Sequence, residues 1–174
     1  HHISPRLVAK HESFGPLADA ISATTTVVFE YRKSDGSQSV REVEPLKLRL
    51  IEGEWVLLAR EREVVKNFLL RRIISKVRDT EALFTPPSDA VITQAEQDLV
   101  AFAASNIAVI EIVPDSEAWW HFGAEKEQLE LSFMDEALMA EDLMEFGADL
   151  KVVSPKSLAD RVQAGFEAVI ASHA

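Results

Sequence analysis

The stretch Gly53-Glu54-Trp55-Val56-Leu57-Leu58-Ala59-Arg60, followed by Lys66-Asn67-Phe68-Leu69-Leu70-Arg71-Arg72-Ile73, decides the fold of the first half of the chain. Period-two alternation predicts that Trp55, Leu57 and Ala59 share one strand face. It also predicts that Phe68, Leu70 and Arg72 share a face of the next strand. An arginine on an apolar face needs an acid or a ligand as partner, because burying an unpaired cation is costly. The sequence therefore predicts neighbouring strands with an apolar interior and a basic edge.

A short helix and three more strands are predicted ahead of this stretch. Residues 15–22 favour a helix with Pro16 in its first turn. Residues 24–32 favour a strand, and Asp35-Gly36 a hairpin turn into a strand over 38–44 that stops at Pro45. Residues 46–50 alternate strictly, Glu52-Gly53 is the next turn, and we expect every turn to contain Gly or Pro. One helix and about five short antiparallel strands favour a small closed barrel.

The second half has a different pattern. Two prolines among small polar residues at 85–89 indicate a boundary. Beyond it we expect strands over 107–113, 129–133 and 150–153, and helices over 95–104, over 116–120, from Asp135 to a stop at Gly147, and from Ser154-Pro155 onward. The last helix has apolar residues at helical spacing: Leu158, Val162, Phe166, Val169 and Ile170. This order predicts an α+β sandwich with helices on one face of an antiparallel sheet.

The expected domain organisation follows from these patterns. We predict a linker or tag remnant over 1–14, a barrel domain over 15–85, a linker with a candidate helix over 86–105, and an α+β domain over 106–174. His1-His2 resemble a tag remnant and are left out of any metal argument.

The composition describes a globular protein. The chain has 174 residues, of which 47% are hydrophobic and 27% charged, and it contains no Cys. No apolar run approaches the roughly 20 residues of a membrane span, and no secretory signal is visible. We therefore expect a cytoplasmic protein without disulfides, thiol nucleophiles or zinc–thiolate sites.

The net charge of −11 is unevenly distributed. Through Thr85 there are 14 Lys and Arg against 12 Asp and Glu, whereas from Pro86 onward there are 4 against 17. Either an anionic partner meets the first half, or the second half simply has an acid-rich surface.

No motif in the sequence indicates an enzyme. The chain has no glycine-rich phosphate loop, no HExxH pair and no GxSxG elbow. Of the five histidines, none outside His1-His2 has metal-ligand spacing from another, and His121 after Trp119-Trp120 is expected to be structural. We therefore predict no catalytic residues, no metal and no cofactor. Trp119-Trp120 is expected to place one ring in the core and the other at a rim or dimer contact.

Basic residues of the first half give the candidate ligand site. A small barrel brings strand ends together, and with them these cations: Arg32, Arg41, Lys66, Arg71 and Arg72. Tyr31 and Trp55 would supply flat rings nearby, a combination that suits a short single strand or a nucleotide. The alternative is neutralisation of these cations by acids in ordinary pairs: Glu30, Glu42, Glu44, Glu61 and Glu63.

Several segments, in this order and spacing, resemble the WYL domain of bacterial transcription regulators: Tyr31-Arg32, 41–46 (REVEPL), 53–59 (GEWVLLA) and 68–73 (FLLRRI). Further segments resemble the WCX extension that follows it: 132–135 (SFMD), 143–147 (LMEFG) and 152–158 (VVSPKSL). Over residues 15–172 the chain is similar to regulators of the proteasome accessory factor B and C type, which belong to the DNA-damage response.

The resemblance implies an Sm-like (SH3-type) barrel followed by a ferredoxin-like α+β domain. It implies a ligand-sensing role, with single-stranded DNA among the ligands. The partners it implies are a second copy or a paralogous regulator, RNA polymerase, and promoter DNA bound by a helix-turn-helix expected to precede His1. It does not imply a membrane partner. A docking module without a small ligand is the alternative.

The candidate site departs from the family pattern. Val56 replaces the tyrosine of the naming tripeptide. In the segment 66–73, Lys66 and Leu69 replace two arginines of the family pattern, and Arg71 replaces an aspartate. Arg72 is an arginine in the family pattern as well. These departures imply a changed ligand preference or a degenerate site.

Overall fold

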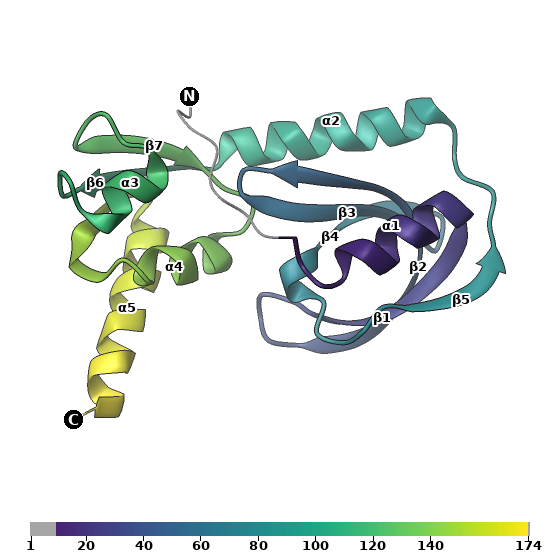
Figure 1. Ribbon diagram of the computed structural model, residues 1–174, viewed down its shortest axis with the longest axis horizontal. Helices are drawn as coiled ribbons and strands as arrows, with labels where there is room; N and C mark the ends of the chain where they lie inside the picture. Colours follow the sequence, from purple (N-terminus) through teal and green to yellow (C-terminus); the bar gives the residue numbers. More distant parts are fainter. Residues whose placement is uncertain (1–9, 174) are drawn as a thin grey trace. The chain divides into compact units, whose positions relative to one another are not determined.

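Residues 10–173 are described by the computed structural model, and they fall into two units that divide between Ala101 and Phe102 (Figure 1). In the described part of the chain, the first unit contains α1 (Phe14–Ala23), β1 (Thr25–Arg32), β2 (Gln38–Ile51), β3 (Glu54–Glu61), β4 (Val64–Leu69), η1 (Leu70–Arg72), β5 (Arg78–Leu83) and most of α2 (Asp89–Ser105). The sheet order is β4-β3-β2-β1-β5, with every neighbouring pair antiparallel. A helix followed by a five-stranded antiparallel sheet confirms the predicted fold class for this half.

Pro45 does not end a strand, contrary to the prediction, because β2 runs through it. β2 pairs with β1 as far as Val43 and with β3 from Glu44 onward. The register shifts between Pro45 and Lys47. Proline cannot donate to a ladder, so it is tolerated where the pairing is irregular. The two strands predicted over 38–44 and 46–50 are therefore one bent strand, and the fifth strand is β5, which the sequence did not reveal.

The turn between β3 and β4 corrects the expectation that every turn contains Gly or Pro. Glu61 pairs with Val64, so Arg62 and Glu63 form a two-residue turn. Their φ angles are +50° and +70°, in the left-handed region that glycine favours. The corresponding turn between β2 and β3 has Gly53 at its second position, with φ +83°.

The predicted strand over 67–73 is interrupted. β4 ends at Leu69, and η1 places Arg72 in a 3-10 turn, so Arg72 does not alternate with Phe68 on a strand face. Phe68, Leu69 and Leu70 are all buried, which regular alternation cannot achieve. Ile73 then forms a bridge with Tyr31 of β1.

The core of the first unit lies between α1 and the inner face of the sheet. Its members come from α1, from each of β1 to β4, from η1 and from the residue that follows η1: Leu17, Ala20, Val27, Phe29, Tyr31, Val43, Leu57, Ala59, Phe68, Leu70 and Ile73. Trp55 packs against this core as predicted for its strand face, together with Phe14 of α1.

The second unit has a three-stranded antiparallel sheet of order β7-β6-β8. Its elements are β6 (Ile107–Ile112), α3 (Glu117–Phe122), β7 (Gln128–Ser132), α4 (Glu136–Met144), η2 (Gly147–Asp149), β8 (Leu150–Ser154) and α5 (Lys156–His173). The unit boundary lies inside α2 (Asp89–Ser105), which begins six residues before the helix predicted at 95–104. Strands and helices alternate as the sequence predicted.

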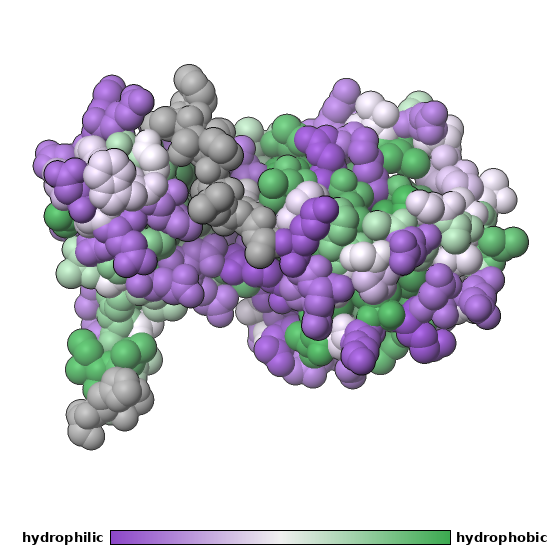
Figure 2. All heavy atoms as spheres, viewed as in Figure 1, coloured by the Kyte–Doolittle hydropathy of each residue, from purple (hydrophilic) through white to green (hydrophobic). Residues whose placement is uncertain are grey.

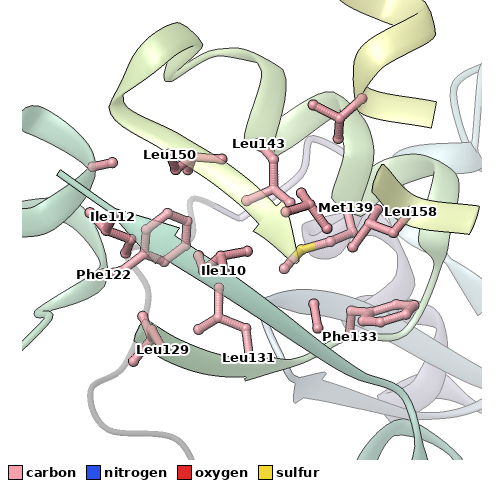
Figure 3. Packing of buried hydrophobic residues seen from close by; sticks show 14 of the residues in the cluster. Ile110, Ile112, Phe122, Leu129, Leu131, Phe133, Met139, Leu143, Leu150 and Leu158 are labelled. Carbon is pink, nitrogen blue, oxygen red and sulfur yellow. The ribbon is translucent and has the colours of Figure 1, made fainter. Parts of the chain in front are cut away.

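One face of this sheet is covered by helices, also as predicted. Alternate residues of the three strands meet side chains of α3, α4 and α5 in a second core (Figure 3). Ile110 of central strand β6 and Leu143 of α4 are fully buried in it. Ser116 Oγ and Asp135 Oδ1 accept hydrogen bonds from the first turns of α3 and α4, at 3.2 and 3.0 Å. These caps fix where both helices begin.

Two helix ends differ from the prediction. α4 ends at Met144, and Gly147, with φ +55°, begins η2 instead of stopping the helix. Val169 and Ile170 do not continue the packed stripe of α5, since they are 55% and 69% exposed. Figure 2 shows hydrophobic residues at the surface of these last turns. Among the described residues, no helix is long and apolar enough to cross a membrane.

Candidate functional site

Arg41 lies on the inner, apolar face of the barrel-like sheet. It pairs with Phe29 of β1, and partners across an antiparallel ladder point to the same face. Lys66 pairs in the same way with Ala59 of β3, another core residue. The sequence predicted a cation on an apolar face and assigned it to Arg72, whereas the structure places Arg41 there.

The two cations meet at one carboxylate. Arg41 Nη1 and Lys66 Nζ each donate to Glu61 Oε1 at 2.9 Å. Arg41 Nε also donates to Ser39 Oγ at 2.9 Å. The side chains of Glu61 and Arg41 are 11% and 15% exposed, whereas that of Lys66 is 44% exposed. We call Arg41, Glu61 and Lys66 the charged cluster.

Aromatic rings lie beside the guanidinium of Arg41. Its Cζ atom is 5.8 Å from the ring centroid of Tyr31 and 5.6 Å from that of Phe68. The two rings pack edge to face with centroids 5.2 Å apart. Tyr31 Oη accepts a hydrogen bond from Leu69 N at 2.9 Å, which ties β1 to the end of β4. The rings fix the position of Arg41 and contribute cation–π attraction.

The electrostatics of the charged cluster favour an ionised Glu61. Burial raises the pKa of Glu61, but the hydrogen bonds and positive charges of Lys66 and Arg41 outweigh that effect. Its pKa therefore lies below the ordinary value for glutamate. The cluster contains two cations and one anion, so it retains an excess positive charge.

Arg71 lies at the opposite end of β3 from the charged cluster. Its Nε donates to Glu54 Oε1 and Oε2 at 3.0 and 3.2 Å, and its Nη2 also donates to Oε1. Glu54 and Glu61 begin and end β3, so they are separated by roughly 20 Å along the strand. The structure thus brings Arg41 and Lys66 together but separates Arg71 from them.

The other predicted site residues lie elsewhere in the first unit. Arg32 is exposed at the end of β1, opposite Gln38, and Arg72 is half-buried in η1. Trp55 packs edge to face on Phe14, with ring centroids 4.8 Å apart. Trp55 Nε1 is buried without a hydrogen-bond partner among residues 10–173. Trp55 is therefore part of the interior against α1.

Glu61 is the member of the charged cluster that was missed as a site residue. It appeared only as one of five acids in the alternative interpretation, and the structure shows that it pairs with both Arg41 and Lys66. A signal was available, because extending the alternation of Trp55, Leu57 and Ala59 by one step places Glu61 on their face. The strand was predicted to end too early for that step.

A second pair of cations on β2 meets a glutamate of α2. Lys47 Nζ donates to Glu96 Oε1 at 3.0 Å, and Arg49 Nη1 donates to Glu96 Oε2. Lys47 pairs with Leu58, whose side chain lies on the face opposite that of Ala59. With its side chain 46% exposed, Lys47 matches Lys66 in exposure and in having a glutamate partner, but it lies on the other face of the sheet.

The second unit shows no comparable set of basic side chains meeting at one acid in the part that the structure describes. Trp119 packs against its core and Trp120 is 69% exposed, as expected for adjacent tryptophans. No group of three or more acidic or histidine side chains within residues 10–173 is placed to hold a metal ion.

Comparison with known proteins finds a family-model match within the first unit. Residues 12–78 match the model of the WYL domain. Two curated relatives, the proteins PafB of Mycobacterium tuberculosis and of Mycobacterium bovis, are each 26% identical over 186 aligned residues. The match covers 93% of this chain and 54% of the relative, so the chain spans about half the length of the curated relatives it matches. A solved structure, the proteasome accessory factor B/C (PafBC) of Arthrobacter aurescens, is similar with 25% identity and a TM-score of 0.60. That match covers 92% of this chain and 27% of the other.

Proposed function

We propose that this chain, whose residues 12–78 match the model of the WYL domain, is the ligand-sensing portion of a bacterial transcription regulator. Its first unit would bind phosphate groups of single-stranded DNA or of a nucleotide-like ligand. The observation that carries the proposal is the charged cluster, in which Arg41 and Lys66 converge on one point.

The chemistry of the cluster suits phosphate. An arginine fork and a lysine ammonium that converge on one anionic oxygen form charge-assisted hydrogen bonds, and phosphate oxygens accept such bonds well. Lys66 is the accessible member, with its side chain 44% exposed, so a ligand would meet it first. The rings of Tyr31 and Phe68 hold the guanidinium of Arg41 in place.

Base stacking has little support at this position. Tyr31 is 8% and Phe68 2% exposed, so neither offers a free ring face, and Trp55 packs against α1. Tyr31 and Trp55 were expected to supply stacking surfaces, and the burial of Tyr31 and the packing of Trp55 on Phe14 argue against that expectation. Recognition through phosphate alone would be tolerant of base identity.

The output would be transcriptional control. Ligand binding would shift the arrangement of domains or of a dimer and so change DNA binding by a helix-turn-helix outside this chain. The similarity to PafB and PafBC supports this proposal. In the same proposal, the chain pairs with a second copy or a paralogous regulator, and RNA polymerase and promoter DNA are partners of the longer protein.

Fluorescence anisotropy with a labelled oligothymidylate of about ten nucleotides tests the proposal. Lys66→Ala removes an accessible cation of the charged cluster, and Lys47→Ala is its matched control on the opposite face. We expect Lys66→Ala to weaken binding several-fold and to reduce the salt slope by about 0.7, the value for one phosphate contact on a single strand. Equal affinities of the two variants, or no salt-dependent binding by the unaltered chain, would refute the proposal.

A docking module without a small ligand is the second candidate, and the exposed apolar residues Val169 and Ile170 on α5 favour it. It predicts a dimer by sedimentation and a melting temperature that no nucleotide changes. Val169→Lys with Ile170→Lys would then produce a monomer while the charged cluster stays intact.

A further inference from the structure

Glu61 occupies the point at which an external phosphate would have to bind. Its Oε1 accepts from both cations of the charged cluster at 2.9 Å, the usual distance for a charge-assisted hydrogen bond. The carboxylate is 11% exposed, so it fills the position under the surface, between Arg41 and the more accessible Lys66. A ligand phosphate and Glu61 cannot both occupy this point, because both are anions that need the same donors.

We propose that the Glu61 carboxylate is an internal competitor that occupies the position of the ligand's phosphate. Glu61 must leave the charged cluster before a phosphate can bind Arg41 and Lys66. This inference rests on the proposed function, since it concerns the regulation of the same site. Glu61 then sets the minimum affinity that a ligand needs in order to bind the charged cluster. Only a ligand whose phosphate binds the two cations better than the tethered carboxylate does can displace it.

The position of Glu61 makes displacement feasible. Glu61 is the last residue of β3 and directly precedes Arg62 and Glu63, the turn residues with positive φ. Its side chain has three rotatable bonds, so the carboxylate can swing toward solvent while the backbone pairing of β3 with β4 is kept. Arg41 keeps its hydrogen bond to Ser39 and its ring neighbours, so it stays positioned when Glu61 leaves.

Competition of this kind has a quantitative consequence. When an internal group occupies a site, the apparent dissociation constant of an external ligand equals its intrinsic dissociation constant divided by the fraction of molecules in which the site is open. Neutralising Glu61 removes the competitor, whereas neutralising another nearby carboxylate changes only the screened long-range field. Glu63 is that other carboxylate, because it is exposed and lies two residues away in the adjoining turn. Its charge acts on Arg60.

The experiment compares Glu61→Gln with Glu63→Gln by anisotropy with the same labelled oligothymidylate. Each substitution removes one negative charge, and glutamine at 61 keeps an acceptor oxygen for Arg41. We expect Glu61→Gln to bind about tenfold more tightly than the unaltered chain. Glu63→Gln is expected to bind no more than about threefold more tightly. Equal gains for the two variants would overturn the inference.

The outcomes separate this inference from the proposed function. If the unaltered chain binds and Lys66→Ala weakens binding, but Glu61→Gln equals Glu63→Gln, only the role of Glu61 as internal competitor fails. If the unaltered chain shows no salt-dependent binding, the proposed function fails and takes the inference with it. Glu61→Ala is the second variant, checked by its thermal melt. Loss of the cooperative melt in both Glu61 variants would overturn the inference, because a carboxylate that the fold cannot release cannot give way to a ligand.

Discussion

The two-residue turns before and after β3 differ at their second position, so glycine can be removed from one turn and introduced into the other. The turn before β3 has Gly53 at its second position with φ +83°, whereas the turn after β3 has Glu63 there with φ +70°. We predict that Glu63→Gly stabilises the first unit and that Gly53→Ala destabilises it.

The magnitude follows from two opposing effects. A residue with a Cβ in the left-handed region costs roughly 1–2 kcal/mol. Glycine loses more backbone entropy on folding, which costs roughly 0.5–1 kcal/mol. The difference predicts that Glu63→Gly gains about 0.5–1 kcal/mol in the free energy of unfolding and that Gly53→Ala loses a similar amount. Glu63→Gln is the control for charge, because it keeps the strained backbone while removing the carboxylate.

Native-state hydrogen exchange is the suitable assay, since the two units need not unfold as one cooperative transition. The slowest amides of β3 report the free energy of unfolding of the first unit, and those of β6 report the second. Opposite changes at β3 for Glu63→Gly and Gly53→Ala are expected, with Glu63→Gln near zero. Destabilisation by Glu63→Gly, or an unchanged free energy of unfolding in Gly53→Ala, would show that backbone strain in these turns does not determine the stability of the first unit.

Three further predictions concern single side chains. Tyr31→Phe leaves the buried N–H of Leu69 without its oxygen acceptor, so we expect a loss of about 1–3 kcal/mol in stability by denaturant unfolding and faster exchange of the Leu69 amide. Asp135→Ala removes the cap that accepts from Leu138 N, and a loss of about 1 kcal/mol is expected, with Asp135→Asn closer to the unaltered chain. The pKa of Glu61 is lower in the folded than in the unfolded state, so its stabilising contribution is present above the unfolded pKa and is lost as pH falls through the folded one. Stability measured against pH should therefore fall less steeply in acid for Glu61→Gln.

Each of these predictions has a result that contradicts it. An unchanged Leu69 exchange rate in Tyr31→Phe would mean that the amide has another acceptor. Equal melts for Asp135→Ala and Asp135→Asn would show that the start of α4 does not depend on the cap. Parallel pH curves for the unaltered chain and Glu61→Gln would show that the pKa of Glu61 is the same in both states.

Much of the fold was predictable because local residue patterns determine it. The β-branched run of β1, the Asp35-Gly36 turn and the stripe of apolar residues at the start of α5 each fix an element without help from distant residues. The errors occur where distant contacts decide. Pro45 lies inside β2 because β2 pairs with β1 before it and with β3 around and after it. No side chain of β5 is buried, so no apolar alternation marked that strand.

The candidate site was predictable in residue type but not in arrangement. Strand periodicity places Arg41 on a face only when the strand's register with β1 is known, and that register comes from the fold. Arg71 pairs with Glu54 across the start of β3, a neighbour that charge counting alone cannot choose. The membership of Lys66 in the charged cluster depends on the Arg62–Glu63 turn, which no glycine or proline marked.

The strand order of the first unit has a consequence for folding kinetics. β1 to β4 form successive hairpins, each closed by a short turn, whereas β5 reaches β1 only by joining Asp79 to Val27. Closing that long segment costs more chain entropy than any hairpin. Little apolar burial offsets the cost, because most β5 residues are exposed and its anchors are hydrogen bonds from Thr25 and Thr80. β5 should therefore dock last during folding and open first during native fluctuations, which makes residues 78–83 the expected site of first proteolytic cleavage.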